Sequence, residues 1–163
     1  MATISAEEAG GAAALEAKGS AIAYAISLIK KWEGCRLGAY PDPATGGEPW
    51  TIGYGATGPG IAKGVRWTQA QADERLAQDV TRFLRGVQSA VKRPATDAQL
   101  GAMTSLAYNI GAKAFTGSTL LRKFNAGDVA GAAAEFVRWN RAGGRVMKGL
   151  TNRRLDEQKV FLG

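Results

Sequence analysis

Two carboxylate side chains, Glu33 and Asp42, lie nine residues apart, the first after an apolar run and the second in a Pro-Asp-Pro turn. A turn can bring two such groups face to face. Hydrolysis of a glycosidic bond needs one protonated carboxyl group for the leaving oxygen and one ionised carboxylate opposite, about 6.5–9.5 Å away where a water molecule attacks. Because Glu33 follows Trp32 at a helix end, it is the better candidate for the acid. The same spacing also fits two solvated surface carboxylates.

The absence of histidine narrows the chemistry further. The 163 residues include no histidine and one cysteine, Cys35. Nucleophilic Ser-His-Asp and Cys-His sites and histidine-bearing zinc sites are therefore excluded, and catalysis must use carboxylates, hydroxyls or lysine. A single cysteine forms no intramolecular disulfide, which favours folding in a reducing cytoplasm.

The net charge of +7 is distributed unevenly, because residues 113–163 carry ten basic and four acidic side chains. Such a balance attracts polyanions, including nucleic acid, anionic lipid and bacterial envelope polymers, without distinguishing among them. No stretch reaches the ~18 uncharged apolar residues of a membrane span. The apolar run from Gly19 to Ile29 also lacks the positive flank of a signal peptide.

Helical spacing of apolar residues is clearest on either side of a region rich in glycine and proline. Ile22, Ile26, Ile29 and Trp32 predict a helix that starts near Ser20 and ends at Gly34. Residues 34–67 indicate short strands and turns.

Two capping boxes then predict helices in the second half of the chain. Thr68 with Gln71 begins a long helix that Pro94 ends, and Thr96 with Gln99 begins a second, which continues to Ile110. Three shorter helices follow, expected from Ser118 or Thr119 through Phe124, from Asp128 through Trp139, and from Leu150 to Leu162.

This order of elements predicts an α+β protein with a small antiparallel β-sheet. Residues 1–21 are expected to be an N-terminal extension, helical or frayed, and residues 22–163 a single domain. Within that domain we expect a β-containing lobe at about 22–67, a connecting helix at about 68–92 and a mainly helical lobe at about 93–163.

The segment around the two carboxylates resembles the phage-type lysozymes, also called endolysins or muramidases, of glycoside hydrolase family 24. The matching residues are Glu33, Tyr40-Pro41-Asp42 and Trp50-Thr51-Ile52-Gly53-Tyr54-Gly55. In the second half, LAYNIG, FTGSTLLRKFNAGD, RWNRAGG and GLTNRR are similar to the helical lobe of that family. The resemblance covers nearly everything after residue 22.

The resemblance implies a two-lobed, lysozyme-like hydrolase of bacterial peptidoglycan that uses no metal and no cofactor. It implies cleavage of the β-1,4 bond between N-acetylmuramic acid and N-acetylglucosamine, which lyses the host cell. Glu33 is then the proton donor, Asp42 the carboxylate that supports or activates the attacking water, and Thr51 the hydroxyl that helps to place it. Inversion at the anomeric carbon is expected.

Four further residues are implied to serve the substrate site. Tyr54, Tyr108 and Ser118 are expected to line the cleft, and Arg153 matches a basic residue that pairs with the catalytic glutamate.

The sequence departs from the family pattern in two places. Asp42 and Thr51 are nine residues apart, where many members have six, so the hairpin is longer and Thr45 competes with Thr51 for the water. Ala56 and Thr57 follow Gly55 where the family usually has a histidine, so that the structural pairing of that histidine is absent or replaced.

Several prominent residues also have a purely structural interpretation. The four tryptophans are more typical of core packing than of sugar stacking. Cys35 is expected to be a small buried hydrophobic residue, and the basic last helix, with Arg153, Arg154 and Lys159, a solvated face.

Two rival functions remain open at this stage. A lytic transglycosylase needs the acid but no positioned water, and a non-enzymatic basic module would bind envelope polymers or nucleic acid. For the preferred endolysin we expect no nucleic acid partner, some attraction to anionic envelope polymers and a monomeric state. We expect synthesis in the host bacterial cytoplasm and access to the wall through a membrane lesion.

Overall fold

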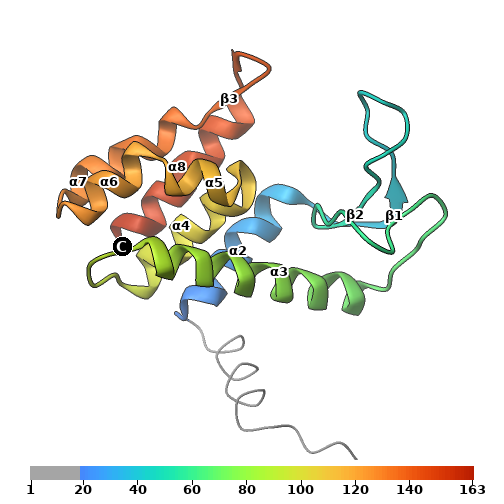
Figure 1. Ribbon diagram of the computed structural model, residues 1–163, viewed down its shortest axis with the longest axis horizontal. Coiled ribbons are helices and arrows are strands. Elements are labelled where there is room, and N and C mark those ends of the chain that lie inside the picture. Colours follow the sequence, from blue (N-terminus) through green and yellow to red (C-terminus); the bar gives the residue numbers. More distant parts are fainter. Residues whose placement is uncertain (1–18) are drawn as a thin grey trace, which may run out of the picture.

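The computed structural model describes residues 19–163, so most of the predicted N-terminal extension lies outside the described part (Figure 1). Its first helix, α2, spans Ala21–Glu33. The Ser20 hydroxyl caps it by accepting a hydrogen bond from the Ala23 amide at 3.1 Å. Gly34 ends it with φ of 65°, a conformation that favours glycine. The predicted helix is thus confirmed at both ends.

A two-stranded antiparallel sheet follows α2. Strand β1, Arg36–Tyr40, pairs with β2, Thr51–Gly53, and the register places Tyr40 opposite Thr51. Residues 41–50 form the loop between the two strands. Figure 1 shows this region on one side of the molecule, away from the helices of the second half.

The helix α3, Gln69–Ala90, runs along the edge of the molecule from the sheet to the helical lobe (Figure 1). Its capping box is complete, because Thr68 accepts from the Gln71 amide and the Gln71 side chain accepts from the Thr68 amide. Leu76, Val80 and Leu84 lie on its buried face. The predicted connecting helix is therefore present.

The helical lobe gathers the rest of the chain around a core formed largely by Met103, Leu106, Phe124, Phe136 and Phe161. Its elements are α4 (Asp97–Ile110), α5 (Ala112–Thr116), α6 (Thr119–Asn125), α7 (Val129–Glu135), a 3₁₀ turn (Phe136–Arg138), β3 (Arg141–Ala142), β4 (Arg145–Val146) and α8 (Lys148–Leu162). The expected α+β architecture with a small antiparallel sheet is confirmed.

Close packing of α2 on α4 ties the front of the chain to the helical lobe. A Cβ added at Gly101 of α4 would lie only 2.4 Å from the Cβ of Tyr24 and 2.9 Å from the Ala21 carbonyl oxygen. Glycine therefore allows the two helices to approach closely. The sequence interpretation grouped α2 with the β-containing lobe, whereas α2 packs chiefly on α4 and α3.

Four features differ from the sequence prediction. The short helix α5 and the β3–β4 hairpin were not predicted, although the adjacent Gly143 and Gly144 are typical of a two-residue hairpin turn. The helix expected to end at Trp139 becomes a 3₁₀ turn after Glu135. The prediction of a solvated basic face on α8 was wrong for Arg154, which is buried, whereas the buried Arg153 pairs with Glu33 as the family resemblance implies.

Within the described residues, no helix combines the length and the apolar character that a membrane crossing requires.

Candidate active site

Glu33 is the last residue of α2, and its side chain is partly buried, with 22% of its surface exposed. Arg153 of α8 donates a hydrogen bond from Nη1 to Glu33 Oε1 at 2.8 Å. Two neighbouring side chains anchor the same turn, because Lys31 and Trp32 both donate to the Asp156 carboxylate. The end of α2 is therefore fixed by α8 through three consecutive residues.

A buried group of charges lies behind Arg153. The Arg154 Nε and Glu157 Oε1 atoms form an ion pair at 2.6 Å, and both side chains have no exposed surface. Ser105 of α4 donates to Glu157 Oε2 at 2.6 Å, and Arg153 Nε lies 3.8 Å from the same oxygen. Burial raises the pKa of Glu157 and lowers that of Arg154, so each charge depends on the other. The buried positive charges of Arg153 and Arg154 are thus balanced by the carboxylates of Glu33 and Glu157.

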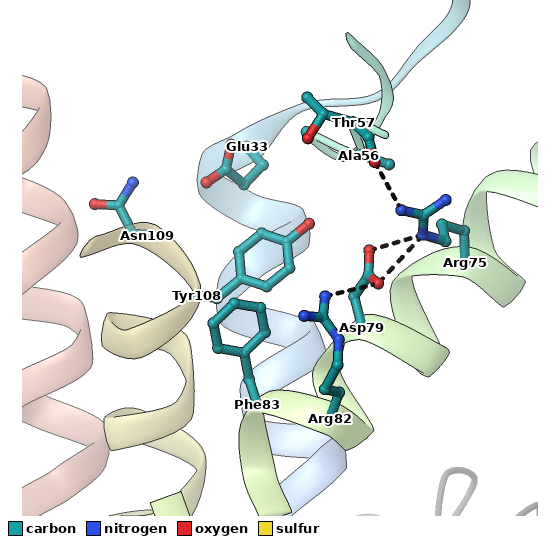
Figure 2. Close-up of a pocket in the computed structure, with 10 residues that line it drawn as sticks. Glu33, Ala56, Thr57, Arg75, Asp79, Arg82, Phe83, Tyr108 and Asn109 are labelled. Atoms are coloured by element: carbon teal, nitrogen blue, oxygen red, sulfur yellow. Dashed lines mark hydrogen bonds and ion pairs between the residues drawn. The ribbon is translucent and has the colours of Figure 1, made fainter. Parts of the chain in front are cut away.

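A cavity of about 340 Å³ opens beside the Glu33 carboxyl group. Figure 2 shows Glu33, Tyr108 and Asn109 on one side of it and Arg75 and Asp79 of α3 on the other. Its lining consists of Glu33, Gly55, Ala56, Thr57, Arg75, Asp79, Arg82, Phe83, Tyr108 and Asn109. Residues from both lobes therefore meet at the Glu33 carboxyl group, which the sequence analysis predicted to be the catalytic acid.

Gly55 and Tyr108 close the cavity around Glu33. Gly55 has φ of 92°, and a Cβ there would lie 3.6 Å from Glu33 Oε2 and 3.9 Å from the Tyr108 hydroxyl. Tyr108 donates from that hydroxyl to the Tyr54 carbonyl. Burial, together with the carboxylates of Glu33 and Asp79, raises the pKa of Tyr108, so the phenol remains a hydrogen-bond donor.

The loop after Gly55 is tied to α3 by an arginine. Arg75 donates from Nη2 to the Thr57 carbonyl at 3.0 Å and from Nε to both oxygens of Asp79 at 3.1–3.2 Å. Arg82 donates to Asp79 Oδ1 from the opposite side at 3.2 Å. Figure 2 shows the bonds from Arg75 and Arg82 converging on Asp79, while a further bond joins Arg75 to Thr57. Where the sequence lacks the family's histidine, Arg75 thus supplies a contact between α3 and the loop.

Replacing Arg75 by alanine is expected to loosen this loop. The Thr57 carbonyl loses its donor and the mostly buried Asp79 loses one of two cationic partners, so the free energy of unfolding should fall by about 1–2 kcal/mol. Chemical denaturation measures this change. Arg85→Ala, on the exposed face of the same helix, is the control and should change stability by less than about 0.5 kcal/mol. Equal losses for the two variants would contradict the assigned role.

Asp42 lies in the loop between β1 and β2, and Thr51 is the first residue of β2. Neither residue lines the cavity. Thr51 faces the same side of the sheet as its partner Tyr40, and Asp42 follows Tyr40 by two residues. The Asp42 carboxylate accepts a hydrogen bond from the Ala44 amide at 2.7 Å, which shapes the turn. The register therefore brings Asp42 and Thr51 to the same end of the sheet.

The hydroxyls of the two competing threonines differ in what they bind. Thr45 donates to the Glu48 carbonyl at 2.7 Å and accepts from the Gly47 amide at 3.2 Å, so its hydroxyl serves the loop. No described residue forms a hydrogen bond with the Thr51 hydroxyl. This difference favours Thr51 as the hydroxyl available to a water molecule.

Tyr54 and Ser118 occupy positions that differ from the cleft-lining role expected of them. The Tyr54 ring is buried in the core, and its hydroxyl donates to Asp73 and accepts from Gln69, each at 3.1 Å. The buried Ser118 caps α6 by accepting from the Leu121 amide and donates to the Phe115 carbonyl. Both hydroxyls are occupied by structural hydrogen bonds, and neither side chain lines the cavity beside Glu33.

Sequence reasoning missed the α3 wall of the cavity, formed by Arg75, Asp79, Arg82 and Phe83, and it missed Asn109. One signal was available for Asp79, because this acidic residue lies next to Val80 on the otherwise apolar face of α3 and has basic residues at helical spacing on both sides. Three of the four tryptophans, Trp50, Trp67 and Trp139, pack against core residues as expected.

The chain is similar to known proteins in both sequence and structure. Residues 30–157 match the family model described as phage lysozyme. An endolysin of Bacillus phage PZA is 46% identical over 83% of this chain and 52% of its own length. An endolysin of Acyrthosiphon pisum secondary endosymbiont phage 1 is 43% identical over 83% of this chain and 93% of its own length.

Among solved structures, a muramidase domain from Asticaccaulis excentricus superposes with a TM-score of 0.78 at 36% identity, covering 85% of this chain and 95% of that one. The chain thus spans about half the length of the Bacillus phage relative and nearly all of the other two.

Proposed function

Because the chain belongs to the phage lysozyme family, we propose that it hydrolyses the β-1,4 bond between N-acetylmuramic acid and N-acetylglucosamine in bacterial peptidoglycan. The observation that carries the proposal is the position of Glu33. Its carboxyl group ends α2, borders the cavity between the lobes and is held by Arg153. A carboxyl group fixed at such an opening is suited to protonate a bound leaving group.

In this mechanism Glu33 donates its proton to the glycosidic oxygen. Asp42 and Thr51 act from the β1–β2 hairpin: the Asp42 carboxylate activates a water molecule, and the Thr51 hydroxyl places it. Attack by this water from the opposite face of the sugar inverts the anomeric carbon. Once Glu33 has lost its proton, Arg153 balances the resulting carboxylate. Tyr108 and Gly55 keep the adjacent backbone in place and border the sugar site.

Product analysis tests the reaction. Purified peptidoglycan digested with the protein is expected to yield muropeptides with ordinary reducing ends, which mass spectrometry distinguishes from anhydromuramyl ends. Anhydro products would show a lytic transglycosylase instead. An absence of glycan cleavage, combined with strongly salt-dependent DNA binding, would favour a basic binding module.

The matched pair Thr51→Ala and Thr45→Ala tests the placement of the water. Thr51→Ala should lower kcat by about tenfold or more, because the attacking water loses a positioned hydrogen bond. Thr45→Ala removes only loop contacts and should lower kcat by less than about threefold. Initial rates on peptidoglycan measure both, and a larger loss at Thr45 would transfer the role to that residue.

The cellular setting is proposed on the same basis. We place synthesis in the host bacterial cytoplasm, with the wall reached through a membrane lesion, and we expect a monomer. The net charge of +7 is compatible with attraction to anionic envelope polymers.

A further inference from the structure

The β3–β4 hairpin and the start of α8 form an exposed protrusion. Every residue from Arg141 to Gly149 is exposed, and Figure 1 shows the hairpin standing out from the helical lobe. We call residues 141–148 the basic hairpin. None of its residues lines the cavity beside Glu33, although Arg141 and Ala142 border a second hollow that shares Asn109 with that cavity.

Positive charge is concentrated on this protrusion. Between Glu135 and Asp156 the chain contains six basic residues and no acidic one. Arg153 and Arg154 are buried, so the exposed charge comes from the remaining four: Arg138, Arg141, Arg145 and Lys148. Arg138 is paired with Glu135 at 3.2 Å. The basic hairpin itself therefore carries Arg141, Arg145 and Lys148.

Apolar side chains lie among these charges. Val146 is 56% exposed and Met147 is 45% exposed, and they are two of the four large hydrophobic residues exposed in the described chain. Met147 also borders a hollow of about 390 Å³ whose lining includes Trp32, Ala142 and Leu150. Adjacent exposed apolar residues between basic ones form an amphipathic surface that no other part of residues 19–163 covers.

We propose that the basic hairpin docks on an anionic lipid bilayer, independently of glycan cleavage. The charges favour the phosphate groups of the lipids, and Val146 with Met147 enters the interfacial region beneath them. A soluble polyanion such as a wall phosphate polymer satisfies the charges but leaves the two apolar side chains in water. The combination of both kinds of side chain on one protrusion is what selects the bilayer.

Flotation of the full chain with lipid vesicles tests the proposal. The protein should float with vesicles of phosphatidylglycerol and phosphatidylethanolamine and remain free with vesicles of phosphatidylcholine. Replacing Arg145 and Lys148 together by glutamine should weaken the partition coefficient by about 25-fold, at about fivefold for each basic side chain. Replacing Val146 and Met147 together by serine should weaken it by about tenfold at constant charge.

Arg85→Gln with Lys113→Gln provides the matched control, since it removes two exposed charges from α3 and α5. This control should lower partitioning by less than about threefold. An equal loss in the control would show attraction by net charge alone and overturn the proposal. Unchanged partitioning of the serine variant would indicate polyanion binding and also overturn it, as would a failure of the wild type to float. Glu33→Gln should float as well as the wild type, so the result is independent of the proposed hydrolysis.

Discussion

Glu33→Gln is expected to abolish most of the glycan hydrolysis while leaving the fold intact. Glutamine has nearly the same shape, and its amide oxygen still accepts from Arg153, but it has no proton to give to the leaving oxygen. General acid catalysis contributes about 10²–10⁴-fold, so kcat should fall by at least about 10²-fold. Release of soluble muropeptides from purified peptidoglycan measures the rate, and circular dichroism checks that the variant is folded.

The matched control is Glu48→Gln, an exposed acidic residue of the hairpin loop, which should retain at least about half of the activity. Full activity of a folded Glu33→Gln protein would refute the acid assignment. If both variants lost activity equally, the loss would reflect surface charge rather than proton donation.

Glu157→Ala is expected to have the largest effect on stability. It removes the carboxylate that pairs with Arg154 at 2.6 Å and accepts from Ser105, and it leaves the fully buried Arg154 charge without its partner. Breaking a buried ion pair from one side costs about 3–5 kcal/mol, a large part of the about 5–15 kcal/mol that stabilises a typical domain. Urea or thermal unfolding of the variant measures the loss.

Lys30→Ala is the control for this experiment, because the Lys30–Asp73 pair is about two-fifths exposed on both sides and should contribute less than about 1 kcal/mol. The double variant Arg154→Met with Glu157→Leu should recover much of the loss, since it removes both charges and fills the space with apolar atoms. A Glu157→Ala protein no less stable than Lys30→Ala would show that the buried pair is not a stabilising unit.

Local signals in the sequence predicted the elements that position the acid. Ser20 and Gly34 mark the ends of α2, and the Thr68 capping box marks the start of α3. These signals act within a few residues, so they can be read without knowledge of the tertiary structure. Glu33 could be selected for the same reason, because a helix end and the following turn are local features.

The parts that sequence reasoning missed depend on contacts between distant segments. In the sequence, Arg75 cannot be distinguished from the other basic residues of α3. Its role follows from the Thr57 carbonyl, which lies beside it only in the folded protein. The buried state of Arg154 depends on the packing of α8 against α4 and on the Trp139 carbonyl, 15 residues earlier in the chain. Tyr54 and Ser118 carry family motif positions, yet their hydroxyls are taken by Asp73 and by a helix cap.

The anchoring of Glu33 by α8 has a consequence for the order in which the protein becomes active. Glu33 and Arg153 are 120 residues apart in the chain, and the Trp32 contact with Asp156 spans 124. During synthesis at about 5–20 residues per second, roughly 6–24 s separate the appearance of the acid from that of its anchor. A ribosome-bound chain that ends before α8 therefore carries the acid without the arginine that holds it, and the proposed hydrolytic competence begins only once α8 has been made.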